Sequence, residues 1–245
     1  MKKATIYQQI QAAKLANQKL LAILLDPDKI VWEVLDSLIV KINQSPATHV
    51  FVGGSQVKST VLDDLIIRIK QDCILPIVLF PGHPSQISNH ADGILFLSLL
   101  SGRNPDYLIE HQVKAAPILK QTQLEIIPTA YLLIESGSET AVERISKTSP
   151  LDRDNLDLVL ATALAGEMLG NKLIYLEAGS GAKKAVPLEM IELVAQNTNI
   201  PLIVGGGIVD LQGIQNAYQS GADLVVIGTA FENNIDFFNS SINSK

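Results

Sequence analysis

The sequence is poor in the residues that carry several common protein functions. Its 245 residues include a single cysteine, Cys73, which excludes an intrachain disulfide and favours a reducing compartment, so we expect a cytoplasmic protein. Cys73 is followed by the apolar residues Ile74 and Leu75, and we interpret it as a packed side chain and not as a nucleophile. The net charge is −6 and the sequence contains no basic cluster, which argues against nucleic acid as a partner.

Long apolar runs are missing as well. No segment approaches the roughly 18 apolar residues that a membrane-crossing helix needs, and the polar, glutamine-rich segment after Met1 does not have the pattern of a signal peptide. The mean hydropathy of +0.24 is nevertheless high for an acidic chain. This hydropathy is compatible with an apolar groove on the protein, although a large core would also explain it.

Aromatic residues make up 5% and charged residues 18%, whereas apolar residues reach 47%. The apolar share consists mainly of Ile, Leu, Val and Ala, which suits strands that are buried on both faces. A chain of this length and composition fits one (β/α)₈ barrel better than two small domains.

Strand-like and helix-like segments alternate along the whole chain. Strands are expected at 20–25, 49–52, 77–80, 93–97, 124–134 (interrupted by Pro128), 172–176, 202–204 and 223–227. Helices are expected at 5–18, 30–42, 62–70, 107–119, 154–169, 188–196, 213–219 and 231–238. Prolines after the third strand leave little room for its helix, and the connection at 135–150 is irregular and long. The pattern predicts one α/β domain over 1–245, a TIM barrel with an N-terminal helix and a modified third βα unit.

Glycine-rich turns follow the last two expected strands. Gly205–Gly207 comes directly after one apolar run, and Gly228-Thr229 comes directly after the next. A buried strand that ends in glycine and opens a helix points backbone N–H groups at whatever lies above it. Two such turns on neighbouring units predict a phosphate site of the kind found after strands seven and eight of a barrel.

The sixth strand carries the sharpest chemical signal. It ends in Tyr175-Leu176-Glu177 and runs into a turn with glycines on both sides of Ser180. Alternation along a strand places Tyr175 and Glu177 on one side and Leu176 on the other. A carboxylate pointing into a barrel mouth is costly to bury unless it is paired or functional. We therefore favour a working glutamate over an exposed one beside a flexible loop.

Two further strand ends bear oxygen ligands. Asp26-Pro27-Asp28-Lys29 follows the first strand, and Gly53-Gly54-Ser55 follows the second. Asp26 and Ser55 have the right chemistry to hold Mg²⁺ together with substrate phosphates. An aspartate or serine cap on the following helix explains the same residues, and the spacing leaves both interpretations open.

The motifs, taken in order, resemble those of the geranylgeranylglyceryl phosphate synthase family. The matching stretches are Leu25–Lys29, Val52–Ser55, Tyr175–Ala182, Val204–Ile208 and Ile227–Ala230. Ser101–Pro105 and the region around Tyr131 and Glu135 are similar to the second subgroup of that family. Each glycine motif alone is common, but the ordered combination is specific.

The resemblance implies a prenyltransferase of phospholipid biosynthesis. It would join a prenyl diphosphate to the 3-hydroxyl of sn-glycerol 1-phosphate and release diphosphate. The resemblance to the second subgroup implies geranylgeranyl diphosphate as the donor. Asp26 and Ser55 would hold Mg²⁺, and Glu177 would be the catalytic base. Glycerol phosphate would bind at Tyr175, Leu176, Glu177, Ala178, Gly179, Ser180, Gly181, Gly205, Gly206, Gly207, Gly228 and Thr229. Arg103 and Tyr131 would contact the prenyl diphosphate.

One departure from the family pattern concerns the substrate phosphate. Some members carry a phosphate-contacting lysine two residues before the metal aspartate, and this chain has Leu24 there. Backbone donors, or a cation from elsewhere such as Lys183, would then take over. We also expect a homo-oligomer through apolar helix faces such as 156–164, and transient membrane contact for a lipid product.

Two other functions fit a phosphate-binding barrel. One is an isomerase or aldolase acting on a phosphorylated metabolite, but the strand ends lack the lysines and cysteines that such enzymes use. The other is a non-catalytic barrel that binds a phosphorylated metabolite. Such a barrel would have no reason to combine Asp26, Ser55 and Glu177.

Overall fold

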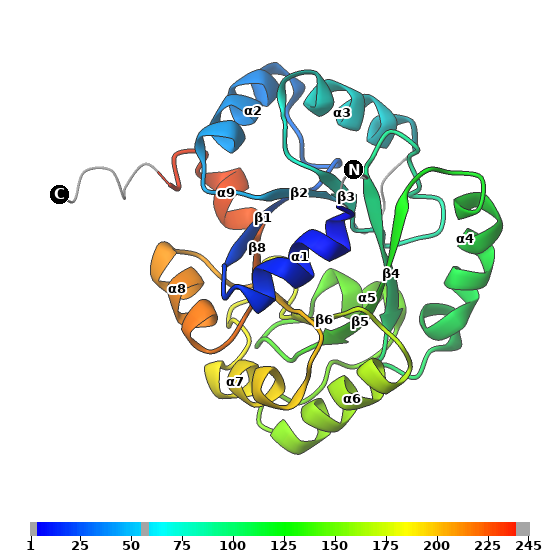
Figure 1. Ribbon diagram of the computed structural model, residues 1–245, viewed down its shortest axis with the longest axis vertical. Helices are drawn as coiled ribbons and strands as arrows, with labels where there is room; N and C mark the ends of the chain where they lie inside the picture. Colours follow the sequence, from blue (N-terminus) through cyan, green and yellow to red (C-terminus); the bar gives the residue numbers. More distant parts are fainter. Residues whose placement is uncertain (1–3, 55–58, 239–245) are drawn as a thin grey trace.

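Eight parallel strands close into a barrel, each paired with the next along the chain and the last with the first (Figure 1). The computed structural model describes residues 4–54 and 59–238. The strands are β1 (Leu20–Leu25), β2 (His49–Val52), β3 (Ile77–Leu79), β4 (Gly93–Leu99), β5 (Glu125–Leu133), β6 (Leu173–Glu177), β7 (Leu202–Gly205) and β8 (Leu224–Ile227). The predicted (β/α)₈ barrel is confirmed.

Helices surround this barrel and cover the outer faces of its strands (Figure 1). They are η1 (Trp32–Val34), α2 (Leu35–Gln44), α3 (Ser59–Asp72), η2 (Asp106–Glu110, a π-helical turn), α4 (His111–Leu119), α5 (Ala141–Ser146), α6 (Leu156–Met168), α7 (Leu188–Asn197), α8 (Leu211–Gln219) and α9 (Thr229–Asn233). The last helix begins two residues earlier than the sequence predicts and ends five residues sooner. Within the described residues, no helix is long and apolar enough to cross a membrane.

Alternation along each strand divides the core into two layers. On β6, Tyr175 packs into the cluster that fills the barrel, whereas Ile174 and Leu176 pack outward against the helices. Tyr175 lies in register with Tyr131 on β5 and Ile203 on β7, so inward side chains from neighbouring strands meet at one level. The predicted facing of β6 is confirmed.

Helix α1 (Ile6–Leu15) lies across the ring of strands in Figure 1 and closes the end of the barrel where the strands begin. Its apolar face, Ile6, Ile10 and Ala13, belongs to the interior cluster. The backbone N–H of Tyr7 donates a 2.9 Å hydrogen bond to the carboxylate of Glu125, at the start of β5. A site in this barrel must therefore open at the opposite end, where the strands finish.

Two segments depart from the regular βα repeat. No helix forms between β3 and β4, as the prolines there predict. The interruption predicted at Pro128 is wrong, because its carbonyl still accepts a 2.8 Å hydrogen bond from Lys172 and β5 continues through it. The connection at 135–150 is less irregular than expected, since Thr140 caps the short helix α5 through the N–H of Glu143.

Candidate active site

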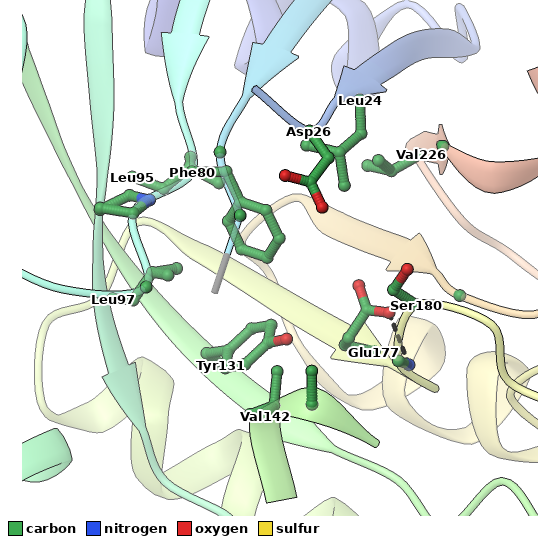
Figure 2. A pocket seen from close by; sticks show the side chains of 18 of the residues that line it. Leu24, Asp26, Phe80, Leu95, Leu97, Tyr131, Val142, Glu177, Ser180 and Val226 are labelled. Carbon is green, nitrogen blue, oxygen red and sulfur yellow. Dashed lines mark hydrogen bonds between the residues drawn. The ribbon is translucent and has the colours of Figure 1, made fainter. Parts of the chain in front are cut away.

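A cavity of about 510 Å³ opens at the end of the barrel where the strands finish (Figure 2). Its walls come from the turns after β1, β2, β6, β7 and β8 on one side, and from β4, α4 and α5 on the other. The first group of walls is rich in glycine and polar side chains, whereas the second is mainly apolar, with His111 and Gln112 as its polar members. The cavity can therefore take a ligand with one anionic end and one hydrocarbon end.

Glu177 lies at the last position of β6 and points into this cavity (Figure 2). Only 5% of the residue is exposed. Its Oε1 accepts a 2.6 Å hydrogen bond from the backbone N–H of Gly179, which fixes the orientation of the carboxyl group. The hydroxyl of Tyr175 lies nearby in the interior but makes no hydrogen bond of regular geometry. The hydrogen bond to one carboxyl oxygen therefore holds Glu177, a potential proton acceptor, at the cavity wall.

Burial raises the pKa of Glu177 above its ordinary value of 4.5, while the nearby Tyr175 hydroxyl and the Gly179 N–H favour the ionised carboxylate and limit the rise. Burial, reinforced by the charge of Glu177, also raises the pKa values of Tyr131 and Tyr175 well above 10. Both phenols therefore keep their protons near neutral pH. A glutamate with a raised pKa is a stronger base than a free one, which suits proton abstraction from an alcohol.

The turns after β6 and β7 present unused main-chain donors to the cavity. Within the described part of the chain, the N–H groups of Ser180, Gly181, Gly206 and Gly207 donate no hydrogen bond, and all four residues line the cavity. Gly228 and Thr229 line it from the neighbouring turn, after β8. Convergent, unsatisfied N–H groups can bind an anion, and the phosphate site predicted at these turns stays a prediction.

Gly206 is required by this geometry. Its φ of +81° lies in the left-handed region, and a Cβ there would come within 2.4 Å of Glu177 Oε1 and 2.5 Å of the Gly179 nitrogen. The β7 turn thus passes directly over the carboxyl group of β6. Any side chain at this position would displace either the base or the anion site.

Asp26 follows β1 and lines the cavity next to two other charged groups. Its Oδ2 is 3.3 Å from the ammonium of Lys29, and its backbone N–H donates a 3.1 Å hydrogen bond to Glu232 on α9. Burial raises the pKa of Glu232, while the Asp26 N–H and the charge of Lys29 oppose the rise. The other residue predicted to bind metal, Ser55, lies outside the described residues.

Three aromatic rings separate the polar side of the cavity from the apolar side. The ring of Phe80 stacks on Tyr175 with centroids 5.4 Å apart, and Tyr131 meets both rings edge-on. In Figure 2, Phe80 and Tyr131 lie between Glu177 and the side chains of Leu95 and Leu97. Tyr131 therefore lines the cavity, and its contact with prenyl diphosphate stays a prediction.

The apolar side extends past β4 to its outer face. Most of its lining residues are apolar and come from both faces of β4, from α4 and from α5; they include Ile94, Leu95, Phe96, Leu97, Leu99, Ala115, Leu119, Ala141, Val142 and Ile145, with His111 and Gln112 beside them. This extension lies next to the gap left by the missing helix after β3. The absent helix and the 135–150 connection, noted in the sequence as departures from the repeat, together shape this half of the cavity.

The Ser101–Pro105 stretch anchors α5 and does not reach the cavity. Asn104 donates a 2.7 Å hydrogen bond to the carbonyl of Ser146 at the end of α5, and the guanidinium of Arg103 donates 2.8 Å bonds to the carbonyls of Leu100 and Gly102. Arg103 is absent from the described lining of the cavity. The contacts therefore give this stretch a role in positioning the wall.

Sequence reasoning missed Phe80, Lys29 and Glu232 as parts of the site. Phe80 follows a short strand and looks like core, and Glu232 lies in a final helix with no motif of its own. The sequence could have indicated Lys29 as a site residue, because it stands three residues after Asp26 in the turn that the resemblance covers. Lys183, suggested from the sequence as a source of positive charge, is exposed and does not line the cavity.

The fold and site are those of the TIM-barrel class of enzymes, with a buried carboxylate and free main-chain donors at the end of the barrel where the strands finish. The model of the PcrB family matches residues 13–244. Geranylgeranylglyceryl phosphate synthases from Flavobacterium johnsoniae and Zunongwangia profunda are 73% and 52% identical to this chain, covering 96% and 91% of it and 97% and 95% of their own lengths. The chain belongs to the PcrB family and, within it, groups with the geranylgeranylglyceryl phosphate synthases.

A solved structure agrees with this assignment. The crystal structure of (S)-3-O-geranylgeranylglyceryl phosphate synthase from Thermoplasma acidophilum, in complex with its substrate sn-glycerol-1-phosphate, superposes with a TM-score of 0.90. The two chains are 33% identical over 97% of this chain and 95% of the other. The protein is a prenyltransferase, and the isomerase, aldolase and non-catalytic alternatives are set aside.

Proposed function

We propose that this protein joins a prenyl diphosphate to the 3-hydroxyl of sn-glycerol 1-phosphate, with geranylgeranyl diphosphate as the preferred donor. The products are an ether-linked lipid precursor and diphosphate. The observation that supports this most strongly is a single cavity with free main-chain donors at one end, a buried carboxylate in the middle and apolar walls at the other end. Each part matches one part of the two substrates.

The phosphate of the acceptor would bind at the glycine turns after β6, β7 and β8. Free N–H groups of Ser180, Gly181, Gly206 and Gly207 offer hydrogen bonds to its oxygens. Anchored there, the glycerol carbons extend toward Glu177, because the Gly206 turn lies directly over that carboxyl group. Holding the acceptor in one orientation removes much of the entropic cost of the bimolecular step.

The reaction requires a proton acceptor for the attacking alcohol. Glu177 would take the proton of the 3-hydroxyl as its oxygen forms a bond to the first carbon of the prenyl chain. The bond from that carbon to the diphosphate breaks, and diphosphate leaves with the electron pair. A positioned base of this kind contributes about 10²–10⁴ in rate. Positive charge develops on the allylic carbon, and the faces of Phe80, Tyr131 and Tyr175 provide a suitable environment for it.

Mg²⁺ is part of the proposal, and the residues fit it. The corner formed by Asp26 and Glu232 already holds a cation, the ammonium of Lys29, at 3.3 and 3.8 Å from carboxylate oxygens. Among the described residues, no three acidic, histidine or cysteine side chains gather around a common point, so substrate diphosphate would complete the oxygen ligands. Bound at Asp26, with Ser55 as the predicted second ligand, Mg²⁺ would offset charge on the departing diphosphate.

The prenyl chain would occupy the apolar side, between β4, α4 and α5. We keep the cytoplasm as the proposed compartment, because a single buried cysteine suits reducing conditions. Self-association is proposed through apolar side chains exposed on and after α6, such as Leu158, Met168 and Leu169. Light scattering of the purified protein tests this last point, and a monomeric mass at micromolar concentration would contradict it.

The function is tested with labelled sn-glycerol 1-phosphate, Mg²⁺ and a series of prenyl diphosphates. Their chains run from about 10 to about 35 carbons in steps of one five-carbon isoprene unit. We expect label to enter an organic-soluble product only when a prenyl diphosphate is present, with the 20-carbon donor preferred. Absence of organic-soluble label with every donor would refute the function. Preference for another length would correct the donor and leave the reaction class intact.

A further inference from the structure

We infer that Lys29 supplies the positive charge that binds the phosphate of sn-glycerol 1-phosphate. This inference rests on the proposed function and assigns one further residue to the same site. The glycine turns offer neutral N–H donors, whereas a phosphate monoester near neutral pH carries close to two negative charges. A cavity wall that binds such a dianion is expected to include a cation.

Lys29 is the only lysine or arginine that lines the cavity in the part of the chain the structure describes. The two histidines in the lining, His83 and His111, pack against each other with ring centroids 5.4 Å apart, and His111 begins α4 on the apolar side. Neither is placed to meet an anion at the β6–β8 turns. As far as the described residues go, the charge balance of the phosphate end therefore depends on Lys29.

The position of Lys29 meets this requirement. Its Nζ lies 3.4 Å from the hydroxyl of Ser180, and that hydroxyl lies 3.4 Å from the hydroxyl of Thr229. The ammonium from the β1 turn thus reaches across the cavity rim to the turns after β6 and β8. A phosphate bound at those turns would lie within contact distance of Nζ after a small rotation of the side chain.

Two carboxylates hold the ammonium without burying it. Its distances are 3.3 Å to Asp26 Oδ2 and 3.8 Å to Glu232 Oε2, and half of the Lys29 side chain remains exposed. The backbone N–H of Lys29 donates a 2.9 Å hydrogen bond to the carbonyl of Asp26, which fixes the turn but leaves the long side chain free. Lys29 can therefore keep one carboxylate contact and turn toward the phosphate.

The described strands of the barrel wall offer no competing cation to the cavity. The side chain of Leu24, on β1, lies beside Gly228, with its Cδ2 3.7 Å from the place where a Cβ of Gly228 would be. Leu24 therefore faces the phosphate end with an apolar group (Figure 2). Within ranges 4–54 and 59–238, the positive charge therefore comes from the rim, and Lys29 is the rim residue that carries it.

Direct binding of sn-glycerol 1-phosphate, measured by calorimetry without metal or prenyl diphosphate, tests the inference. Lys29→Met should weaken binding by about 10- to 100-fold, the range of one charge-assisted hydrogen bond. Lys29→Arg should keep most of the affinity, because the charge remains. Lys183→Met is the matched control, an exposed lysine next in chain to the β6 turn but outside the cavity, and should bind like wild type. Thermal unfolding of each variant confirms that it is folded.

A second pair of variants separates direct contact from an indirect effect. Removing Lys29 leaves Glu232 and Asp26 without a counter-charge. Repulsion between these carboxylates and the phosphate would by itself weaken binding of the phosphate. We therefore compare Glu232→Gln with the double variant Lys29→Met/Glu232→Gln. The loss caused by Lys29→Met should persist in this background. If it disappears, Lys29 acts only by neutralising Glu232, and the inference is wrong.

Three further results would overturn the inference. The first is an unchanged affinity of Lys29→Met for sn-glycerol 1-phosphate, and the second is an equal loss of that affinity in Lys29→Arg and Lys29→Met. The third is a defect of Lys29→Met that is confined to the KM for prenyl diphosphate. Failure of the proposed function looks different, since wild-type protein itself would then bind no sn-glycerol 1-phosphate.

Discussion

The backbone N–H of Gly179 donates a 2.6 Å hydrogen bond to Oε1 of Glu177, two residues before it in the chain. The turn that begins the anion site thus also orients the carboxyl group. Gly206 closes over the same oxygen from β7, so the proposed base and the proposed phosphate site share one set of backbone atoms. A change that moves these backbone atoms is expected to affect both, whereas an isosteric change of the side chain is not.

Glu177→Gln should separate chemistry from binding. The amide keeps the shape of the side chain and an oxygen for the Gly179 N–H, but it does not accept a proton. We expect kcat to fall by about 10²–10⁴ while the Kd for sn-glycerol 1-phosphate changes little. Glu189→Gln, an exposed glutamate on α7, is the matched control and should leave both constants unchanged. Wild-type turnover in Glu177→Gln would remove its role as the base.

The raised pKa of Glu177 predicts the acid side of the pH profile. The base works only when ionised, so kcat should fall as pH drops through a pKa above 4.5, the ordinary value. The rate is measured against pH at saturating substrates. A rate that stays level down to the ordinary titration range of a glutamate would contradict a buried base.

The same shift predicts a stability effect with a defined sign. Between the unfolded pKa, near 4.5, and the higher folded pKa, native Glu177 binds more protons than the unfolded chain, so the free energy of unfolding falls as pH rises. Glu177→Gln lacks this contribution. Denaturant unfolding of both proteins should therefore show Glu177→Gln gaining stability relative to wild type across that interval. A difference independent of pH would show that Glu177 titrates normally in the folded protein.

Gly206→Ala should damage the phosphate site directly. Its Cβ would meet Glu177 Oε1 at 2.4 Å, so the turn or the carboxyl group must move, and we expect at least about tenfold weaker binding of sn-glycerol 1-phosphate. Gly170→Ala is a matched control, with a similar φ of +91° but no atom within 4 Å of the added carbon. It should cost about 1–2 kcal/mol of stability through backbone strain and leave binding intact. Equal affinities in calorimetry would place the phosphate elsewhere.

Asp26→Asn should raise the Mg²⁺ concentration that gives half-maximal activity by about tenfold or more, since a neutral amide is a poor ligand for a hard cation. Asp28→Asn is the control, because Asp28 is exposed and is not among the residues lining the cavity. Activity is titrated with Mg²⁺ at fixed substrates. Identical titration curves for Asp26→Asn and wild type would exclude Asp26 as a ligand.

Most of the fold could be predicted from local patterns. Apolar runs bounded by glycine and proline placed all eight strands, because strands buried on both faces need such runs wherever they pair. Boundaries were less certain, since hydrogen bonding with neighbours decides where an element ends. Pro128 illustrates this, because its missing N–H suggested a break that the ladder from β6 does not require.

The sequence by itself determined the barrel, the facing of Tyr175 and Glu177, and the glycine turns beside them, because a strand period of two and glycine turns are properties of a few consecutive residues. Only the tertiary structure decided which charges meet. Lys29, Ser180 and Glu232 come from three separate turns or helices and become neighbours when the barrel closes. The apolar half of the cavity likewise exists only once α4 and α5 pack beside the gap after β3. Such contacts depend on the shape of the closed ring, which no local pattern encodes.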